Sequence, residues 1–161
     1  MESYGEILHH CCQSILDGSK IDINAAVNAV DNNHVKCLEY ILQNSNIDDE
    51  TLIDRAIWLN HIECLKVAIQ QGCKKMEDAY TSAVNSNNLE CLKLLHINGF
   101  PKSAEATNAA SSDYSLLECL EFLLQNNHPC NFEECVSFAA FNGHWKTVEC
   151  LLKYRKQRLE M

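Results

Sequence analysis

Histidines and cysteines are the first residues to consider for chemistry, because their side chains bind metals and act as bases or nucleophiles. The chain has 161 residues, among them 7 His and 10 Cys. Four of these stand in a row: His9, His10, Cys11 and Cys12. Adjacent residues on a helix point about 100° apart, so the four side chains cannot all grip one ion. No second pair with zinc-ligand spacing accompanies them, so we predict helix and packing residues rather than a metal site.

Other cysteines recur at a fixed interval. Cys37, Cys64 and Cys91 are evenly spaced along the chain, and Cys119 follows after an interval that is longer by a single position. We call these four the anchor cysteines. In stacked repeats, equivalent positions lie about 10 Å apart, which is too far for a disulfide. The less patterned thiols, for which no activating base is evident, are Cys73, Cys130 and Cys135.

Three histidines share one register, which argues against a catalytic centre. His34, His61 and His144 each stand three residues before the anchor cysteine or its equivalent, Thr147. Ligands of a single site would not recur in this way, so the pattern indicates a structural role in every unit. No Gly-rich phosphate loop, catalytic Ser motif or paired-carboxylate signature occurs. We therefore predict no enzyme, no catalytic residues and no cofactor.

Composition narrows the class of protein further. A hydrophobic fraction of 47% with only 5 Gly and 2 Pro favours a globular, helical domain. The net charge of -9 argues against nucleic acid as a partner, although the basic run at residues 153–158 could bind a small anion. No apolar run could span a membrane and no secretory signal is visible, so we expect no membrane contact. We expect an intracellular, reducing compartment, cytoplasmic or nuclear.

An internal repeat supplies the elements that position these residues. Residues 33–39 return at 60–66 and again at 87–93. A second landmark, the marker alanine, precedes the anchor position by a constant interval, as Ala29 precedes Cys37. The marker alanines are Ala29, Ala56, Ala83 and Ala139. In the fourth copy the interval is longer, and residues 111–115 hold a small insertion that predicts a lengthened turn.

Each unit is predicted to form two short helices, because apolar residues recur at helical spacing between acidic starters and Asn or Gly terminators. First helices are expected near 22–31, 49–58, 76–86, 103–111 and 132–141. Second helices are expected near 4–17, 35–44, 62–71, 89–98, 116–126 and 145–157. The predicted fold is an all-α solenoid over one domain, residues 1–161. It comprises a capping helix at 1–18 and repeats at about 21–45, 48–73, 76–100, 103–128 and 131–157.

The repeat resembles the ankyrin family. Residues 139–144 look like the ankyrin segment between the inner and outer helices, and residues 147–152 resemble the outer helix. Residues 92–101 are similar to a shortened variant that is abundant in large DNA viruses and some protists. Standard units have about 33 residues, so the 27 to 28 found here leave no room for the family's β-hairpin finger. The resemblance implies short connections, no finger sheet, and a histidine that hydrogen-bonds the turn between helices.

The resemblance also implies a binding surface, because ankyrin inner helices line a concave face. The residues that it places there are Asn28, Asp31, Arg55, Trp58, Leu59, Asn85, Phe138 and Phe141. Interfaces favour aromatic and Arg side chains, although the aromatic residues could instead be partly buried by neighbours. We expect a monomeric protein–protein interaction module, an adaptor or a viral factor that engages a host protein. The alternative is a helical repeat that binds a metal or small ligand through Cys and His.

Overall fold

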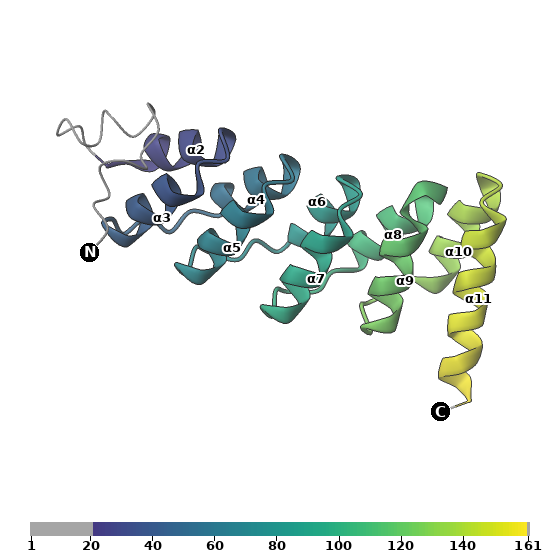
Figure 1. Ribbon diagram of the computed structural model, residues 1–161. Coiled ribbons are helices and arrows are strands. Elements are labelled where there is room, and N and C mark those ends of the chain that lie inside the picture. The colour runs from purple at the N-terminus through teal and green to yellow at the C-terminus, as the bar shows by residue number, and fades with distance from the viewer. Residues whose placement is uncertain (1–20, 161) are drawn as a thin grey trace. The chain divides into compact units, whose positions relative to one another are not determined.

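The computed structural model describes residues 21–160, and every regular element in this range is helical. The expected capping helix at 1–18 lies outside the described residues. The elements are α2 (Ile23–Asp31), α3 (Val35–Gln43), α4 (Thr51–Trp58), α5 (Ile62–Gln70), α6 (Ala79–Asn85), α7 (Leu89–Ile97), α8 (Ala104–Ser112), the 3-10 turn η2 (Tyr114–Leu116), α9 (Leu117–Gln125), α10 (Phe132–Phe141) and α11 (Trp145–Leu159) (Figure 1). The all-α class is confirmed for this range, and none of its helices is long and apolar enough to span a bilayer.

The chain divides into two compact units. The N-terminal unit runs to Met76 and the C-terminal unit starts at Glu77, a boundary that falls between two of the expected repeats. In the N-terminal unit, α2 packs on α4 and α3 packs on α5, while each first helix also packs on its own second helix. The C-terminal unit repeats this scheme: α6, α8 and α10 pack in succession, and so do α7, α9 and α11. Helix pairs therefore stack in order within each unit.

The marker alanine and the recurrent histidine are two ends of one capping motif. The amide of His34 donates to the carbonyl of Ala29 at 2.8 Å, and that of His61 donates to Ala56 at 2.9 Å. The residue before each histidine is an Asn with positive φ, namely Asn33 (54°) and Asn60 (57°). This is the Schellman ending, in which a left-handed residue lets the next amide reach back to the last turn. The fixed spacing of the two landmarks follows from this hydrogen bond.

The core explains why the anchor position is small and apolar. Cys64, Cys91 and Cys119 are fully buried between neighbouring helices, and so are the marker alanines Ala56 and Ala83. Small side chains on the first helices let the helices approach closely, while the second helices contribute the bulk of the apolar volume. The insertion at residues 111–115 forms the 3-10 turn η2, where Asp113 accepts a hydrogen bond from the amide of Ser115. The predicted lengthened turn is therefore present, and α8 ends at Ser112.

The cysteines correct one expectation. The described residues contain free thiols at Cys64, Cys73, Cys91, Cys119, Cys130, Cys135 and Cys150. Cys37 is disulfide-bonded. The expectation of reduced cysteines is therefore wrong at Cys37.

Candidate interaction surfaces

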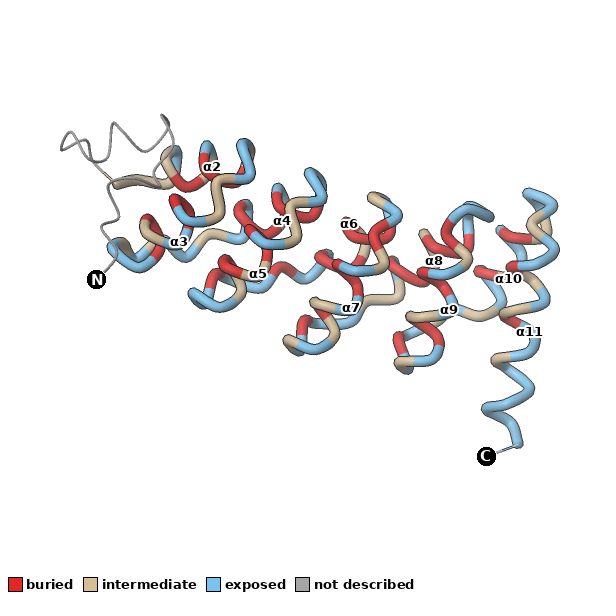
Figure 2. Tube along the Cα trace, in the orientation of Figure 1, coloured by how far each residue is buried: buried red, intermediate tan, exposed pale blue. Residues whose placement is uncertain are grey.

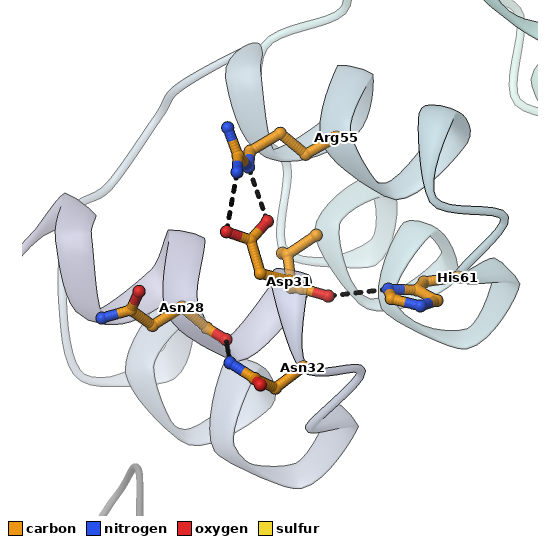
Figure 3. A network of polar contacts seen from close by, with 6 residues as sticks. Asn28, Asp31, Asn32, Arg55 and His61 are labelled. Atoms are coloured by element: carbon orange, nitrogen blue, oxygen red, sulfur yellow. Dashed lines mark hydrogen bonds and ion pairs between the residues drawn. The ribbon is translucent and has the colours of Figure 1, made fainter.

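Two of the predicted site residues of the N-terminal unit are bound to each other. Arg55 of α4 donates from Nε and Nη2 to the two carboxylate oxygens of Asp31 at the end of α2, at 2.6 and 2.7 Å (Figure 3). The hydrogen bond from Arg55 lowers the pKa of the Asp31 carboxyl. The pairing has the bidentate geometry in which Arg best recognises a carboxylate. A partner that binds Arg55 must therefore compete with Asp31.

The other predicted residues of this unit are exposed. Asn28 lies on α2, and its carbonyl accepts a hydrogen bond from the side chain of Asn32 at 2.8 Å (Figure 3). Trp58 ends α4 with 54% of its surface exposed, and Leu59 follows with 43% exposed. Trp58 is therefore partly covered and partly exposed, and its role in binding stays a prediction.

The C-terminal unit exposes the two predicted phenylalanines on one face of α10. Cys135 and Ala139 form the buried face of this helix. Phe138 and Phe141 lie three residues apart, away from those buried positions, and are 48% and 90% exposed. Asn85, the remaining predicted residue, is exposed at the end of α6. Exposure makes all of these side chains available, and whether they bind a partner stays a prediction.

Sequence reasoning missed two exposed aromatic residues close to this helix. Trp145 begins α11 and is 65% exposed, and Tyr114 of η2 is 73% exposed. The Tyr114 ring meets the ring of His144 edge-on with centroids 5.9 Å apart, which places it beside the turn from α10 to α11. This turn is largely exposed (Figure 2). We call Tyr114, Phe138, Phe141 and Trp145 the aromatic surface.

A signal for Trp145 was present in the sequence. Trp145 follows the recurrent histidine directly, at a position where other repeats have the aliphatic residues Val35, Ile62 and Leu89. These aliphatic side chains are half-buried in the structure. A large aromatic ring in place of a half-buried aliphatic residue is the kind of departure that marks an interface.

The recurrent His and Cys side chains bind neighbouring turns of the same unit. Nδ1 of His61 lies 2.7 Å from the carbonyl oxygen of Val30, in the preceding helix pair. The thiol of Cys64 lies 3.4 Å from Oδ1 of Asn33 in the same preceding turn. His61 therefore contacts the last turn of helix α2 in the preceding pair, whereas the resemblance implied a bond to the turn between helices. Nδ1 of His144 has no hydrogen-bond partner in the described part of the chain.

The described range holds a ligand-sized pocket but no cluster of metal-binding side chains. Within residues 21–160, no group of three or more His, Cys, Asp or Glu side chains could hold a metal ion, and the His9–Cys12 segment lies outside this range. A pocket of about 430 Å³ lies between the connection that precedes α10 and the last turns of α11. Among its lining residues, Arg155 stacks over the ring of Phe132 at 4.6 Å. The basic run near the end of the sequence thus forms one wall of this pocket.

No family model matches the chain, and neither a curated protein nor a solved structure matches it. Function is therefore inferred from the sequence pattern and the geometry of the two units.

Proposed function

We propose that the chain is a protein–protein interaction module, a solenoid of short ankyrin-like repeats, and that a partner protein binds at the aromatic surface. The exposure of four aromatic side chains at and beside one turn carries this proposal, with Phe141 exposed to 90%. Monomeric proteins rarely leave such side chains together in water unless they bind something. Aromatic side chains are also the residues that contribute most often to binding hot spots.

The repeat pattern supports the ankyrin-like part of the proposal. Units of nearly constant length, each shorter than a standard ankyrin repeat, recur along the sequence. The inner helix of most pairs ends in the Schellman motif that joins the marker alanine to the residue after the left-handed position. Short connections stand where ankyrin proteins have their fingers, so binding falls to the helices and to the turns at their ends. In the N-terminal unit, Trp58 and Leu59 provide a second candidate surface of this kind.

The chemistry of the chain favours a protein as the partner. A net charge of -9 repels a phosphate backbone. The aromatic surface offers flat apolar rings together with the Tyr114 hydroxyl, a combination that suits an apolar patch with a polar rim. In this role the chain is a monomeric intracellular adaptor, or a viral factor that occupies a host protein.

A small-ligand function is the second candidate, and the 430 Å³ pocket beside α11 favours it. Its volume lies within the range of about 300–1,000 Å³ that is typical of ligand sites. Its walls include Arg155, Arg158 and Tyr154, which suit an anionic ligand better than a metal ion. Thermal-shift screening of the purified chain against anionic metabolites would test this candidate separately from protein binding.

Affinity capture from cells of the source organism, compared between variants, tests the proposed function. Phe141→Ala and Trp145→Ala should lose a captured protein that the wild type retains. Ile97→Ala is the matched control, because Ile97 is 80% exposed on α7 and lies outside the aromatic surface. The captured protein is then produced pure and its Kd is measured for each variant. A Kd that Phe141→Ala and Trp145→Ala leave unchanged would contradict the proposal.

A further inference from the structure

Two free thiols lie in contact at the start of α10. The sulfur atoms of Cys130 and Cys135 are 3.8 Å apart. Cys130 belongs to the irregular connection before α10, while Cys135 faces inward from the first half of the helix. A disulfide requires a sulfur–sulfur distance of about 2.05 Å. Because Cys130 is outside the helix, rotation of its side chain can supply most of the remaining approach.

The pocket beside α11 gives a reagent access to this pair. Cys130 is half-buried and lines the pocket of about 430 Å³, whereas Cys135 is fully buried behind it. A small molecule therefore meets the sulfur of Cys130 first. Arg155 and Arg158 line the same pocket, so a reagent that carries carboxylates is attracted to it.

The two thiols also differ chemically from the anchor cysteines. A hydrogen bond from Cys130 lowers the pKa of Cys135 to about 7, with a smaller contribution from Ser111, and the same contact raises the pKa of Cys130. Burial instead raises the pKa of Cys64 to about 11 and that of Cys91 to about 12. Near neutral pH, the second thiol of the pair is therefore available as a thiolate, and the anchor thiols are not.

We propose that Cys130 and Cys135 form a reversible oxidation site, which a small anionic disulfide such as oxidised glutathione converts into an intrachain disulfide. In the first step Cys130 passes its proton to the Cys135 thiolate, and the resulting Cys130 thiolate attacks one sulfur of the reagent. A mixed disulfide forms and one glutathione thiolate leaves. In the second step Cys135 loses its proton to water and attacks the sulfur of Cys130, which forms the intrachain bond and releases the second glutathione thiolate.

The two steps balance. The Cys130 thiol and the Cys135 thiolate together lose one proton and two electrons, and the glutathione disulfide accepts the electrons as it is reduced to two glutathione thiolates, which take up protons from water. Reduced glutathione reverses the reaction by the same route. In its thiol form Cys135 donates to Oδ1 of Asn108 on α8 at 3.2 Å, and the disulfide has no proton to donate in this contact. The reaction therefore takes place at a contact between two first helices of the C-terminal unit.

Mass spectrometry of the full chain tests the proposal. The reduced protein is incubated in glutathione buffers of increasing oxidation, free thiols are blocked with N-ethylmaleimide in acid, and the chain is cut at Glu133 and Glu134 so that the two cysteines fall on separate peptides. We expect a Cys130–Cys135 linked pair of peptides that forms before any link among the other cysteines that are free thiols in the structure, and that disappears in reduced glutathione. Absence of this link in buffers that oxidise other thiols of the chain would overturn the proposal.

Variants assign the order of the steps. Cys135→Ser should stop at the mixed disulfide, with one glutathione on residue 130 that forms more slowly because water must take the proton of Cys130, whereas Cys130→Ser should leave the buried Cys135 unmodified. Cys150→Ser, which changes a half-buried thiol on α11, is the matched control and should form the same link as the wild type. Glutathione on Cys135 in the Cys130→Ser variant would contradict the order. If circular dichroism shows that the Cys135→Ser variant does not fold, the peptide map of the wild type tests the proposed disulfide without it.

A second reagent tests the charge preference. The rate of each reagent with the protein is divided by the rate of the same reagent with free cysteine. This normalised rate should be several-fold higher for oxidised glutathione than for neutral hydroxyethyl disulfide. Arg158→Gln should bring the two normalised rates together. Equal normalised rates with the two reagents in the wild type would overturn the preference for an anionic reagent. Formation of the disulfide is tested separately by the peptide map.

Discussion

The Nδ1 atom of His61 lies 2.7 Å from the carbonyl oxygen of Val30, which belongs to the preceding helix pair (Figure 3). The carbonyl can only accept, so Nδ1 carries the proton in this contact. The backbone amide of His61 at the same time donates to Ala56 in its own helix pair. One residue therefore closes its own turn through its backbone and joins that turn to the previous one through its side chain.

The first prediction concerns this link. His61→Ala should lower the free energy of unfolding by about 1–2 kcal/mol, because one partly buried hydrogen bond is lost. Urea titration followed by circular dichroism measures the change. His144→Ala is the matched control, since His144 occupies the same register and its Nδ1 has no hydrogen-bond partner among the described residues. Equal losses in the two variants would show that the bond to Val30 is not what stabilises the stack.

The left-handed residue after α9 gives a second prediction. Asn127 has φ of 55°, and the equivalent residues after α5 and α7 are Gly72 and Gly99. Asn127→Gly should change stability by no more than a few tenths of a kcal/mol, because glycine adopts this conformation freely. Asn127→Ala should cost about 1 kcal/mol, because a Cβ is disfavoured in the left-handed region.

Thermal unfolding of these two variants checks the prediction. Gln125→Ala supplies the control, because Gln125 is an exposed residue in the last turn of α9 and alanine fits a helix well. An alanine at residue 127 that is as stable as glycine there would contradict the conformational argument.

The ion pair between Asp31 and Arg55 gives a third prediction. Their side chains are 30% and 47% exposed, and exposed pairs contribute only about 0–1 kcal/mol. Asp31→Asn and Arg55→Gln should each change the free energy of unfolding by less than about 1 kcal/mol. A double-mutant cycle in low and high salt measures the coupling, which should shrink as salt is added. A coupling well above this range that persists in high salt would mark the pair as a structural clamp.

Helix positions could be predicted closely because their determinants are local. The period of apolar residues and the Asn or Gly terminators placed α3, α5 and α10 within a residue or two of where the structure has them. The spacing between the marker alanine and the histidine was also visible. The cause of this spacing could not be predicted. It is a backbone hydrogen bond between residues five positions apart, and such a bond requires no particular side chain.

The candidate surfaces were less predictable, because exposure depends on which elements pack together. The equivalent positions in other repeats hold half-buried aliphatic residues, and only the structure shows that Trp145 is exposed. Tyr114 belongs to the insertion, for which no other repeat offers a template. The contact between Cys130 and Cys135 was not predicted, for a related reason. One of them lies outside any helix, so no periodicity places the two sulfur atoms together.

A buried histidine makes the stability of the C-terminal unit sensitive to acid. His128 follows the left-handed Asn127, in the position that Cys73 and Phe100 occupy in other repeats, and is 1% exposed. Its ring meets that of Tyr80 at 4.3 Å, and neither of its nitrogens has a hydrogen-bond partner in the described range. Burial lowers the pKa of His128 to about 4, and the charges of Lys102 and His96 add to the effect.

The sign of the pH dependence follows from this shift. The unfolded chain has a His pKa near 6.5, so between about pH 6.5 and pH 4 the unfolded state binds a proton that the folded state does not. The free energy of unfolding should therefore fall as the pH is lowered through this window, by up to about 3 kcal/mol in total. The carboxyls of Asp49 and Asp113, whose pKa values lie below 3.8, lose their stabilising contributions only at lower pH.

Urea titrations of the wild type and of His128→Phe across this window measure the effect. Phenylalanine fills the equivalent position at residue 100, where it is buried, so the variant should fold and should lose most of the fall in stability between pH 6.5 and pH 4. Asn127→Gly changes the adjacent residue without removing the histidine and should keep the pH dependence of the wild type. If His128→Phe keeps the pH dependence of the wild type too, burial of His128 is not its cause.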